Sequence, residues 1–211
     1  MKITKYVHSC LLVETEKQVI LIDPGQFSWE SGLFKVDSLD KLDVVVITHE
    51  HFDHFHVPFV EAVLRKFPQV QFVSTPAVVA RLQEMGVSNA TSESIPGVEI
   101  FSRKAHASLE PLGEAPENIA VHIADGLTIG GDRHDLEETK DALALTVTAP
   151  WGSMVGAAAM AQRLKPKIIV PVHDWHWNET ARSGAYDRLE EFFAKQGTIF
   201  IKPVDGQAFE A

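Results

Sequence analysis

Apolar and polar residues alternate along the first part of the chain and then give way to continuous apolar runs. Residues 2–23 (KITKYVHSCLLVETEKQVILID) alternate β-branched and polar residues, pause at the polar turn ETEK and resume as VILID. This alternation around a turn predicts an opening β-meander. The run DVVVI, residues 43–47, is apolar after its first residue, which predicts a strand that is buried on both faces.

Helical and strand-like segments alternate over the rest of the chain. Apolar residues recur at helical spacing in 57–67 and in 76–86, where Pro76 and Gly86 mark the two ends, and VQFVS (70–74) between them has the pattern of a strand. We predict further strands at 98–103, 119–124, 127–129, 142–148 and 167–172, and helices at 152–164 and 186–195. No linker or short repeat divides the chain, so we expect one layered α/β domain over residues 1–211.

Composition and charge narrow the classes of function. The chain has 211 residues, 45% of them hydrophobic, and a formal net charge of −10, which repels phosphate backbones; no cluster of lysine and arginine offsets it, so nucleic acid is not expected as a partner. Its apolar runs are shorter than the ~20 residues that span a bilayer. The one cysteine, Cys10, has no internal disulfide partner, and MKITKYVHSC lacks the apolar run of a signal peptide. We therefore expect a cytoplasmic protein without a membrane segment.

The stretch ITHEHFDHFH (47–56) concentrates metal-binding chemistry. Four of the chain's ten histidines lie within it, with carboxylates between them, directly after the predicted buried strand. Neutral imidazole binds divalent metals and carboxylate is its harder partner. Residues i and i+2 at an extended strand end point the same way, so His49 and His51 can converge on one ion, while Asp53 and His54 face a neighbouring one.

Three later residues also follow predicted strands and could complete a metal site. His106 follows VEIFSRKA, Asp132 follows LTIGG, and His173 follows KIIVPV. Loops at strand ends recur as carriers of ligands in proteins. Together with the four residues above, they make seven nitrogen and oxygen ligands, enough for two ions that share one carboxylate.

The order His49-x-His51-x-Asp53-His54, then His106, Asp132 and His173, resembles the metallo-β-lactamase-fold superfamily of binuclear hydrolases. The runs ENIAVHIADGLTIGGD and LKPKIIVPVHD resemble most closely its ascorbate-6-phosphate lactonase-like branch. The resemblance implies a four-layer αββα sandwich with the site at one edge between two sheets. It also implies a buried structural role beside the site for Asp23 in ILIDPG.

Carried over residue by residue, the resemblance implies that His49, His51 and His106 bind a first metal, that Asp53, His54 and His173 bind a second, and that Asp132 bridges them. Zn²⁺ and Mn²⁺ suit this all-nitrogen-and-oxygen set, and Fe²⁺ also fits. A metal-bridging hydroxide, oriented by Asp53, would then be the nucleophile. The redox di-iron relatives place a glutamate where this chain has His51, which favours hydrolysis over electron transfer.

Other residues receive smaller roles. His134 and His176 follow presumed ligands and are candidate acids or hydrogen-bond donors, whereas we expect no ligand role for His8, His56 or His122. Gly130 and Gly131 are expected to permit crowding of the backbone near Asp132. Substrate specificity is assigned to segments 25–37 and 107–118 and to the region around Trp175; Trp151, Trp175 and Trp177 are candidates for the walls of a pocket.

The sequence therefore predicts a metal-dependent hydrolase that attacks a small ester, lactone or phosphoester. A nucleic-acid phosphodiesterase and a non-catalytic metal-binding or ligand-sensing domain are the alternatives, and a mononuclear iron thiol dioxygenase-like enzyme is a third. The expected partner is a small-molecule substrate. A homo-oligomer is compatible with the sequence, and so is a monomer.

Overall fold

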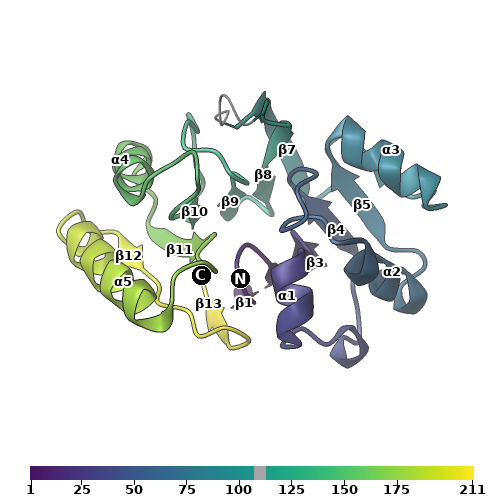
Figure 1. Cartoon of the computed structure of the whole chain (residues 1–211), viewed down its shortest axis with the longest axis horizontal. Coiled ribbons are helices and arrows are strands. Elements are labelled where there is room, and N and C mark those ends of the chain that lie inside the picture. Colours follow the sequence, from purple (N-terminus) through teal and green to yellow (C-terminus); the bar gives the residue numbers. More distant parts are fainter. Residues whose placement is uncertain (107–112) are drawn as a thin grey trace.

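The computed structural model describes residues 1–106 and 113–211, which form two β-sheets packed face to face with helices on the outer side of each (Figure 1). Helices α1–α3 lie on one side of the pair of sheets and helices α4 and α5 on the other. The αββα sandwich predicted from the sequence is confirmed.

The first sheet has seven strands in the order β13-β1-β2-β3-β4-β5-β6. Strands β1, β2 and β3 are the predicted antiparallel meander, and β3, β4, β5 and β6 run parallel. The bounds are β1 Lys2–Lys5, β2 Leu11–Glu14, β3 Val19–Ile22, β4 Val44–Ile47, β5 Gln71–Ser74, β6 Ala90–Thr91 and β13 Ala208–Glu210.

The second sheet has six strands in the order β12-β11-β10-β9-β8-β7. Strands β9, β10, β11 and β12 are parallel, and β8 is antiparallel to both β7 and β9, so β7 and β9 run in the same direction. The bounds are β7 Val98–Ala105, β8 Glu117–Ile123, β9 Leu127–Ile129, β10 Ala142–Thr146, β11 Ile168–Val172 and β12 Ile199–Phe200.

The helices cover the outer faces of the sheets and begin at residues suited to capping. The side chains of Thr75, Ser153 and Asn178 accept hydrogen bonds from the first turns of α3, α4 and α5, which satisfies backbone donors that the helix leaves open. The bounds are α1 Gln26–Ser31, the 3-10 helix η1 Val36–Ser38, α2 Val57–Lys66, α3 Pro76–Glu84, α4 Met154–Leu164 and α5 Glu179–Ala194. No helix in the described ranges is both long and apolar enough to cross a membrane.

Three apolar clusters hold these layers together. The inner faces of the two sheets meet in one cluster, where Ile20 and Val46 of the first sheet pack with Val121 and Val170 of the second. Separate clusters join α2 and α3 to the first sheet and α4 and α5 to the second. Burial stabilises each contact by about 25 cal/mol per Å² of apolar surface, so the sheets form a firm base for the loops at their edges.

Some elements differ from those predicted. The last helix starts at Glu179 and not at Tyr186, because Asn178 caps it and because Tyr186, Leu189 and Phe193 bury its later turns. The predicted loop 25–37 contains α1 and η1, and β6 and β13 were not predicted. Residues 107–112 of the predicted loop 107–118 lie outside the described residues, and Glu117 already begins β8.

Candidate metal centre

Loops that follow four strands meet at one edge of the sandwich. The chain leaves β4 into His49, β7 into His106, β9 into Asp132 and β11 into His173. The carboxyl ends of β7, β9 and β11 lie at the same edge of the second sheet because the three strands run in the same direction. A backbone hydrogen bond of 2.9 Å from Ile119 N to the Thr48 carbonyl joins the end of β4 to the second sheet.

The first cluster of side chains contains the three histidines predicted for the first metal. One ligand atom from each of His49, His51, His106 and Asp132 lies within 4.8 Å of the others. His49 Nε2 and His51 Nδ1 face each other at 3.0 Å, as expected of two nitrogens that converge on one point. This cluster draws residues from both sheets.

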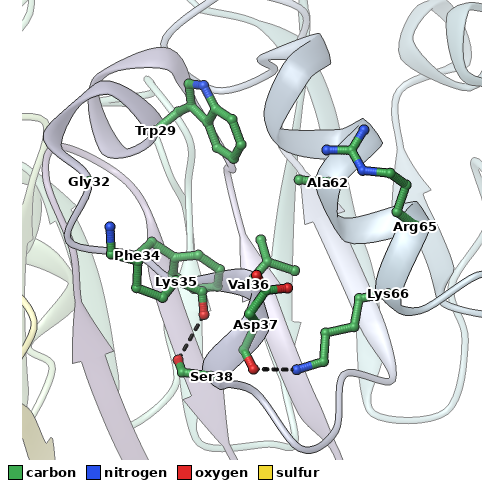
Figure 2. Close-up of a pocket in the computed structure, with 10 residues that line it drawn as sticks. All are labelled: Trp29, Gly32, Phe34, Lys35, Val36, Asp37, Ser38, Ala62, Arg65 and Lys66. Atoms are coloured by element: carbon green, nitrogen blue, oxygen red, sulfur yellow. Dashed lines mark hydrogen bonds between the residues drawn. The ribbon is translucent and has the colours of Figure 1, made fainter.

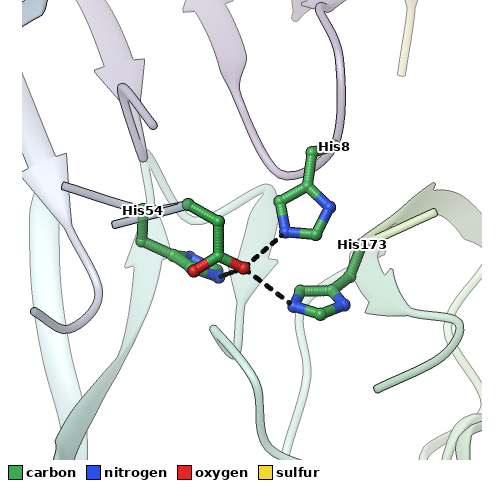
Figure 3. Close-up of side chains that lie close together, drawn as sticks. His8, His54 and His173 are labelled. Carbon is green, nitrogen blue, oxygen red and sulfur yellow. Dashed lines mark hydrogen bonds and ion pairs between the residues drawn. The ribbon is translucent and has the colours of Figure 1, made fainter. Parts of the chain in front are cut away.

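The second cluster contains the three residues predicted for the second metal and one more. Ligand atoms of Asp53, His54, His173 and His8 lie within 4.8 Å of one another. His8 Nε2 lies 3.0 Å from Asp53 Oδ2, and His173 Nε2 lies 3.5 Å from the same oxygen. Figure 3 shows His8, His54 and His173 pointing toward a shared carboxylate. We expected no ligand role for His8, which comes from the turn between β1 and β2 and lies within this cluster.

Asp132 lies between the two clusters and turns one oxygen toward each. Its Oδ2 is 3.4 Å from His49 Nε2, and its Oδ1 is 3.1 Å from His54 Nε2 and 3.3 Å from His173 Nε2. Its exposed fraction is 1%, yet neither of its oxygens, nor the Nε2 of His54 or of His173, has a hydrogen-bond partner. Buried polar atoms without partners are costly, and atoms that converge in this way fit a bound metal ion.

The same contacts shift the pKa values of the cluster. Burial lowers the pKa of His173, but Asp132 and Asp53 outweigh burial and raise it to about 9. Burial would raise the pKa of Asp132, but the histidines around it, His54 and His173 first, hold it well below its usual range. The carboxylates therefore carry negative charge, and without a metal they retain protons on the histidines that a cation would displace.

Hydrogen bonds behind the centre fix the orientation of the ligands. His54 Nδ1 lies 2.8 Å from Asp23 Oδ2, and His173 Nδ1 donates to the Thr148 carbonyl at 2.6 Å, which leaves both Nε2 atoms facing Asp132. Asp23 also accepts from the backbone N and the hydroxyl of Thr48 at 2.7 and 3.0 Å. Its buried location beside the site is the one the resemblance implied. Such outer contacts set the tautomer and the basicity of metal ligands.

Backbone strain concentrates at this centre. His8, Asp23 and His173 have φ values of 68°, 45° and 64°, in the left-handed region that non-glycine residues rarely adopt. Each such residue costs roughly 1–3 kcal/mol, and the cost is met by surrounding packing. Gly131, with φ of 58°, permits the approach of Asn118, whose Oδ1 accepts from Asp132 N at 3.1 Å; a Cβ on Gly131 would lie 2.1 Å from that oxygen. This is the backbone crowding expected near Asp132.

The remaining histidines lie in different parts of the structure, and His134, His56 and His122 do not line the cleft that opens on the centre. His176 is exposed, lies at the rim of the cleft that opens on the centre, and has its Nε2 3.4 Å from Thr148 Oγ1. His134 belongs to neither cluster and does not line this cleft; its Nε2 donates to the Thr146 carbonyl at 2.7 Å. His56 caps α2, and His122 stacks on Phe101 within the second sheet at a centroid distance of 4.0 Å.

A cleft of about 480 Å³ opens onto the two clusters. His51, Asp53 and His173 form part of its lining, and Trp151 and Trp175 stand among the aromatic residues around them. Trp177 does not line it and packs instead against the core between the second sheet and its helices. The cleft is therefore the route by which a small molecule would reach the centre.

A larger hollow of about 980 Å³ lies elsewhere, between residues 29–38 and α2 (Figure 2). Trp29 and Phe34 form its apolar wall, and Lys66 Nζ donates to the Asp37 carbonyl at 2.6 Å. None of the residues of the two clusters lines it. We therefore place the chemistry in the smaller cleft.

Comparisons with known proteins identify the family of the chain. The beta-lactamase superfamily domain model matches residues 2–173. Protein Rv0786c of Mycobacterium tuberculosis is 29% identical over 206 residues, which cover 90% of this chain and 92% of that protein. The UPF0173 metal-dependent hydrolase of Salinibacter ruber is 27% identical over 195 residues, which cover 82% of this chain and 84% of that protein.

A solved structure shows the same fold. Igni18, a metallo hydrolase from the archaeon Ignicoccus hospitalis, matches with a TM-score of 0.70 and 19% identity over 100% of this chain and 98% of its own. These comparisons do not test the lactonase-like branch, which stays a prediction. Because the domain model covers most of the chain and the fold agrees, the chain belongs to the beta-lactamase superfamily, the metallo-β-lactamase-fold superfamily that its histidine pattern resembles.

Proposed function

We propose that the chain is a binuclear metal-dependent hydrolase that acts on a small ester, lactone or phosphoester. The observation that carries this proposal is Asp132, a buried carboxylate with one oxygen toward each of two histidine clusters and no hydrogen-bond partner for either. The names of relatives such as the UPF0173 metal-dependent hydrolase of Salinibacter ruber support it. Zn²⁺ and Mn²⁺ suit the ligands best, and Fe²⁺ also fits.

The residues present fit two ions of this kind. His49, His51 and His106 would hold the first, Asp53, His54 and His173 the second, and Asp132 both. Divalent ions in such a pair supply an activated water molecule and withdraw charge from the bond that is cleaved. Hydrolysis then adds the elements of one water molecule across that bond, and the leaving group departs with a proton.

Asp53 and His176 would orient the attacking water and the leaving group. Burial alone would raise the pKa of Asp53, but His54, His173 and His8 lower it, so this carboxylate stays ionised at the floor of the cleft and can accept a hydrogen bond from the attacking water. Burial and His173 lower the pKa of His176, which is therefore neutral at pH 7 and available at the rim as a hydrogen-bond donor to the leaving group. His134 remains a candidate from the sequence, but its backbone contact favours His176 for this role.

Metal analysis by elemental mass spectrometry is the first test. We expect about two divalent ions per chain in protein purified without chelator, and one or none in Asp132→Ala. Asp135→Ala is the matched control, since this carboxylate, 44% exposed, pairs with Arg133 outside both clusters. Wild-type protein that takes up no Zn²⁺ or Mn²⁺ would refute the proposal.

A substrate panel separates catalysis from mere binding of metal. We expect the metal-loaded protein to hydrolyse at least one ester, lactone or phosphoester, and Asp132→Ala to be inactive on it. Two bound ions without turnover of any member would favour the non-catalytic metal-binding or ligand-sensing domain instead. Salt-sensitive cleavage of RNA or DNA would favour the nucleic-acid phosphodiesterase.

A further inference from the structure

Aromatic side chains wall the cleft above the candidate metal centre. Phe27, Phe52, Trp151 and Trp175 line it, together with Ala149 and Pro150. They come from α1, from the loop after β4, from the loop after β10 and from the loop after β11, which are distant in sequence and converge on one opening. Such convergence on a concave site predicts a ligand that the aromatic groups contact together.

One wall is a stacked aromatic group that is open to solvent. Phe27 stacks on Trp175 with ring centroids 3.8 Å apart and meets Phe52 edge to face at 5.6 Å. Phe52 is 58% exposed and Trp175 is 47% exposed, although both could gain by burial. Large apolar side chains that gather in the open beside a candidate site mark a contact surface for an apolar group.

Trp151, another part of the lining, is held in place by two of the predicted metal ligands. Trp151 stacks on His106 with centroids 4.3 Å apart and an angle of 22° between the rings. Its Nε1 donates to the Asp132 carbonyl at 3.2 Å. The indole is therefore fixed relative to the centre, so an apolar group in the cleft has a defined distance from the bond that is cleaved.

The lining of the cleft disfavours an anionic group far from the centre. Among the described residues that line it there is no lysine or arginine. An anionic group held against these aromatic walls would lose water without gaining a partner, which is costly. Only at the centre, where metal ions would sit, can negative charge be balanced.

We propose that this cleft selects a hydrolysable substrate, such as an ester, with an aromatic or bulky apolar group that carries no negative charge and lies against Trp151 and the Phe27–Trp175 stack. The proposal rests on the proposed hydrolytic function and narrows its substrate class.

A pair of matched esters tests the selection. 4-Methylphenyl acetate and 4-acetoxybenzoate share one scissile bond: water adds to the acetyl carbon, the bond to the phenolic oxygen breaks, and acetate and the phenol are released. At high ionic strength, which screens the net charge of −10, we expect kcat/KM to be roughly tenfold higher for the uncharged ester. The phenol that bears the carboxylate is a better leaving group than 4-methylphenol, so the intrinsic reactivity of the two esters opposes this result. Equal values, or a preference for 4-acetoxybenzoate, would overturn the proposal.

Substitution of Phe52, in the solvent-exposed aromatic group, tests whether this residue contacts the aromatic ring of the substrate. In Phe52→Ala we expect the ratio of kcat/KM for 4-methylphenyl acetate to that for ethyl acetate to fall roughly tenfold, because only the first ester has a ring to lose contacts. Phe192→Ala is the control, a phenylalanine of α5 that is 36% exposed and lies outside the cleft, and its ratio should equal the wild-type ratio. An unchanged ratio in Phe52→Ala would contradict the assignment.

Binding of a ketone that cannot be hydrolysed separates this proposal from the proposed function. By calorimetry on metal-loaded protein, 4-methylacetophenone should bind more tightly than 4-acetylbenzoate, and Phe52→Ala should weaken its binding while Phe192→Ala should not. If the ketone binds in this way but no ester is hydrolysed, hydrolysis fails and the apolar cleft stands. If esters are hydrolysed but 4-methylacetophenone binds no more tightly than 4-acetylbenzoate, the cleft proposal fails and the proposed hydrolytic function stands.

Discussion

His8 illustrates how a single residue can belong to a site without a sequence signal. We expected no ligand role for it, yet its exposed fraction is 1%, its Nε2 lies 3.0 Å from Asp53 Oδ2 and its ring lies 4.0 Å from that of His173. Burial lowers its pKa to about 3, so the ring is neutral and can either hold Asp53 in position or bind metal itself.

Replacement of His8 should weaken the second cluster selectively. In His8→Ala we expect the affinity for one of two metal ions to fall roughly 10-fold to 100-fold, the usual effect of losing a group that orients a ligand. Competition with a chelator of known affinity measures this. His122→Ala is the matched control, because His122 is also a buried histidine but lies outside both clusters. Wild-type affinity in His8→Ala would contradict a role in the centre.

His122 should make the stability of the fold depend on pH. Burial lowers its pKa below the ordinary value of 6.5, although a hydrogen bond to Glu138 opposes the shift. As pH falls below 6.5 the unfolded chain takes up the proton first, so this contribution to the free energy of unfolding is full above 6.5 and is lost as pH falls toward the folded pKa. We would measure the free energy of unfolding of metal-stripped protein with denaturant at neutral and at mildly acidic pH. It should fall more between the two pH values in wild type than in His122→Gln. Equal losses would mean that the ring is not held neutral.

At the level of strands and helices, the sequence predicts most of the edge that carries the site. Apolar runs and alternation are local, so β4, β9, β10 and β11 were found with small errors at their ends. His49, Asp132 and His173, which follow three of these strands, lie in the two clusters. The early turns of α5 were missed because Ser183 and Gly184 are weak helix formers that interrupt its pattern. The place of His8 depends on how β1 lies beside the other strands, which no local pattern reports.

A largely buried ion network ties four parts of the chain together. Lys5 of β1, which is fully buried, lies 3.1 Å from Asp174 after β11 and 3.0 Å from Asp205 before β13. Tyr186 of α5 donates to Asp174. Because Asp174 follows His173 directly, this network also anchors the loop that carries a predicted metal ligand.

Loss of Lys5 should destabilise the fold strongly. In Lys5→Met the buried carboxylate of Asp174 loses its cation, whereas Asp205 keeps Arg182 at 2.9 Å. Removal of one partner from a buried pair costs about 3–5 kcal/mol. Lys202→Met is the control, because Lys202 is 42% exposed and its pairs with Asp187 and Glu190 are worth less than about 1 kcal/mol. Urea unfolding measures both. Similar losses in the two variants would show that the network adds nothing to the other contacts of β1.

Across the whole molecule, each cluster takes ligands from both sheets. His8 and His54 come from the first sheet and His173 from the second, while His49 comes from the first and His106 from the second. The two sheets also meet through apolar contacts in the core, through the hydrogen bond from Ile119 to Thr48 and through the Lys5–Asp174 ion pair. A metal ion in either cluster would therefore join the two halves of the sandwich at the edge where loops, and not strands, face each other.

Removal of metal should consequently lower the melting temperature of the whole fold and not only abolish activity. An ion that binds only the folded chain, at a free concentration of about a thousand times its dissociation constant, raises the free energy of unfolding by about 4 kcal/mol. For a chain of this size, that corresponds to a rise of roughly 10 °C in the melting temperature. Calorimetry with and without chelator measures the shift. Asp132→Ala, which loses the carboxylate shared by both clusters, should show a much smaller shift on chelation. If chelation removes the metal but leaves the wild-type melting temperature unchanged, the ions do not join the two sheets, and the clusters are held by their own hydrogen bonds alone.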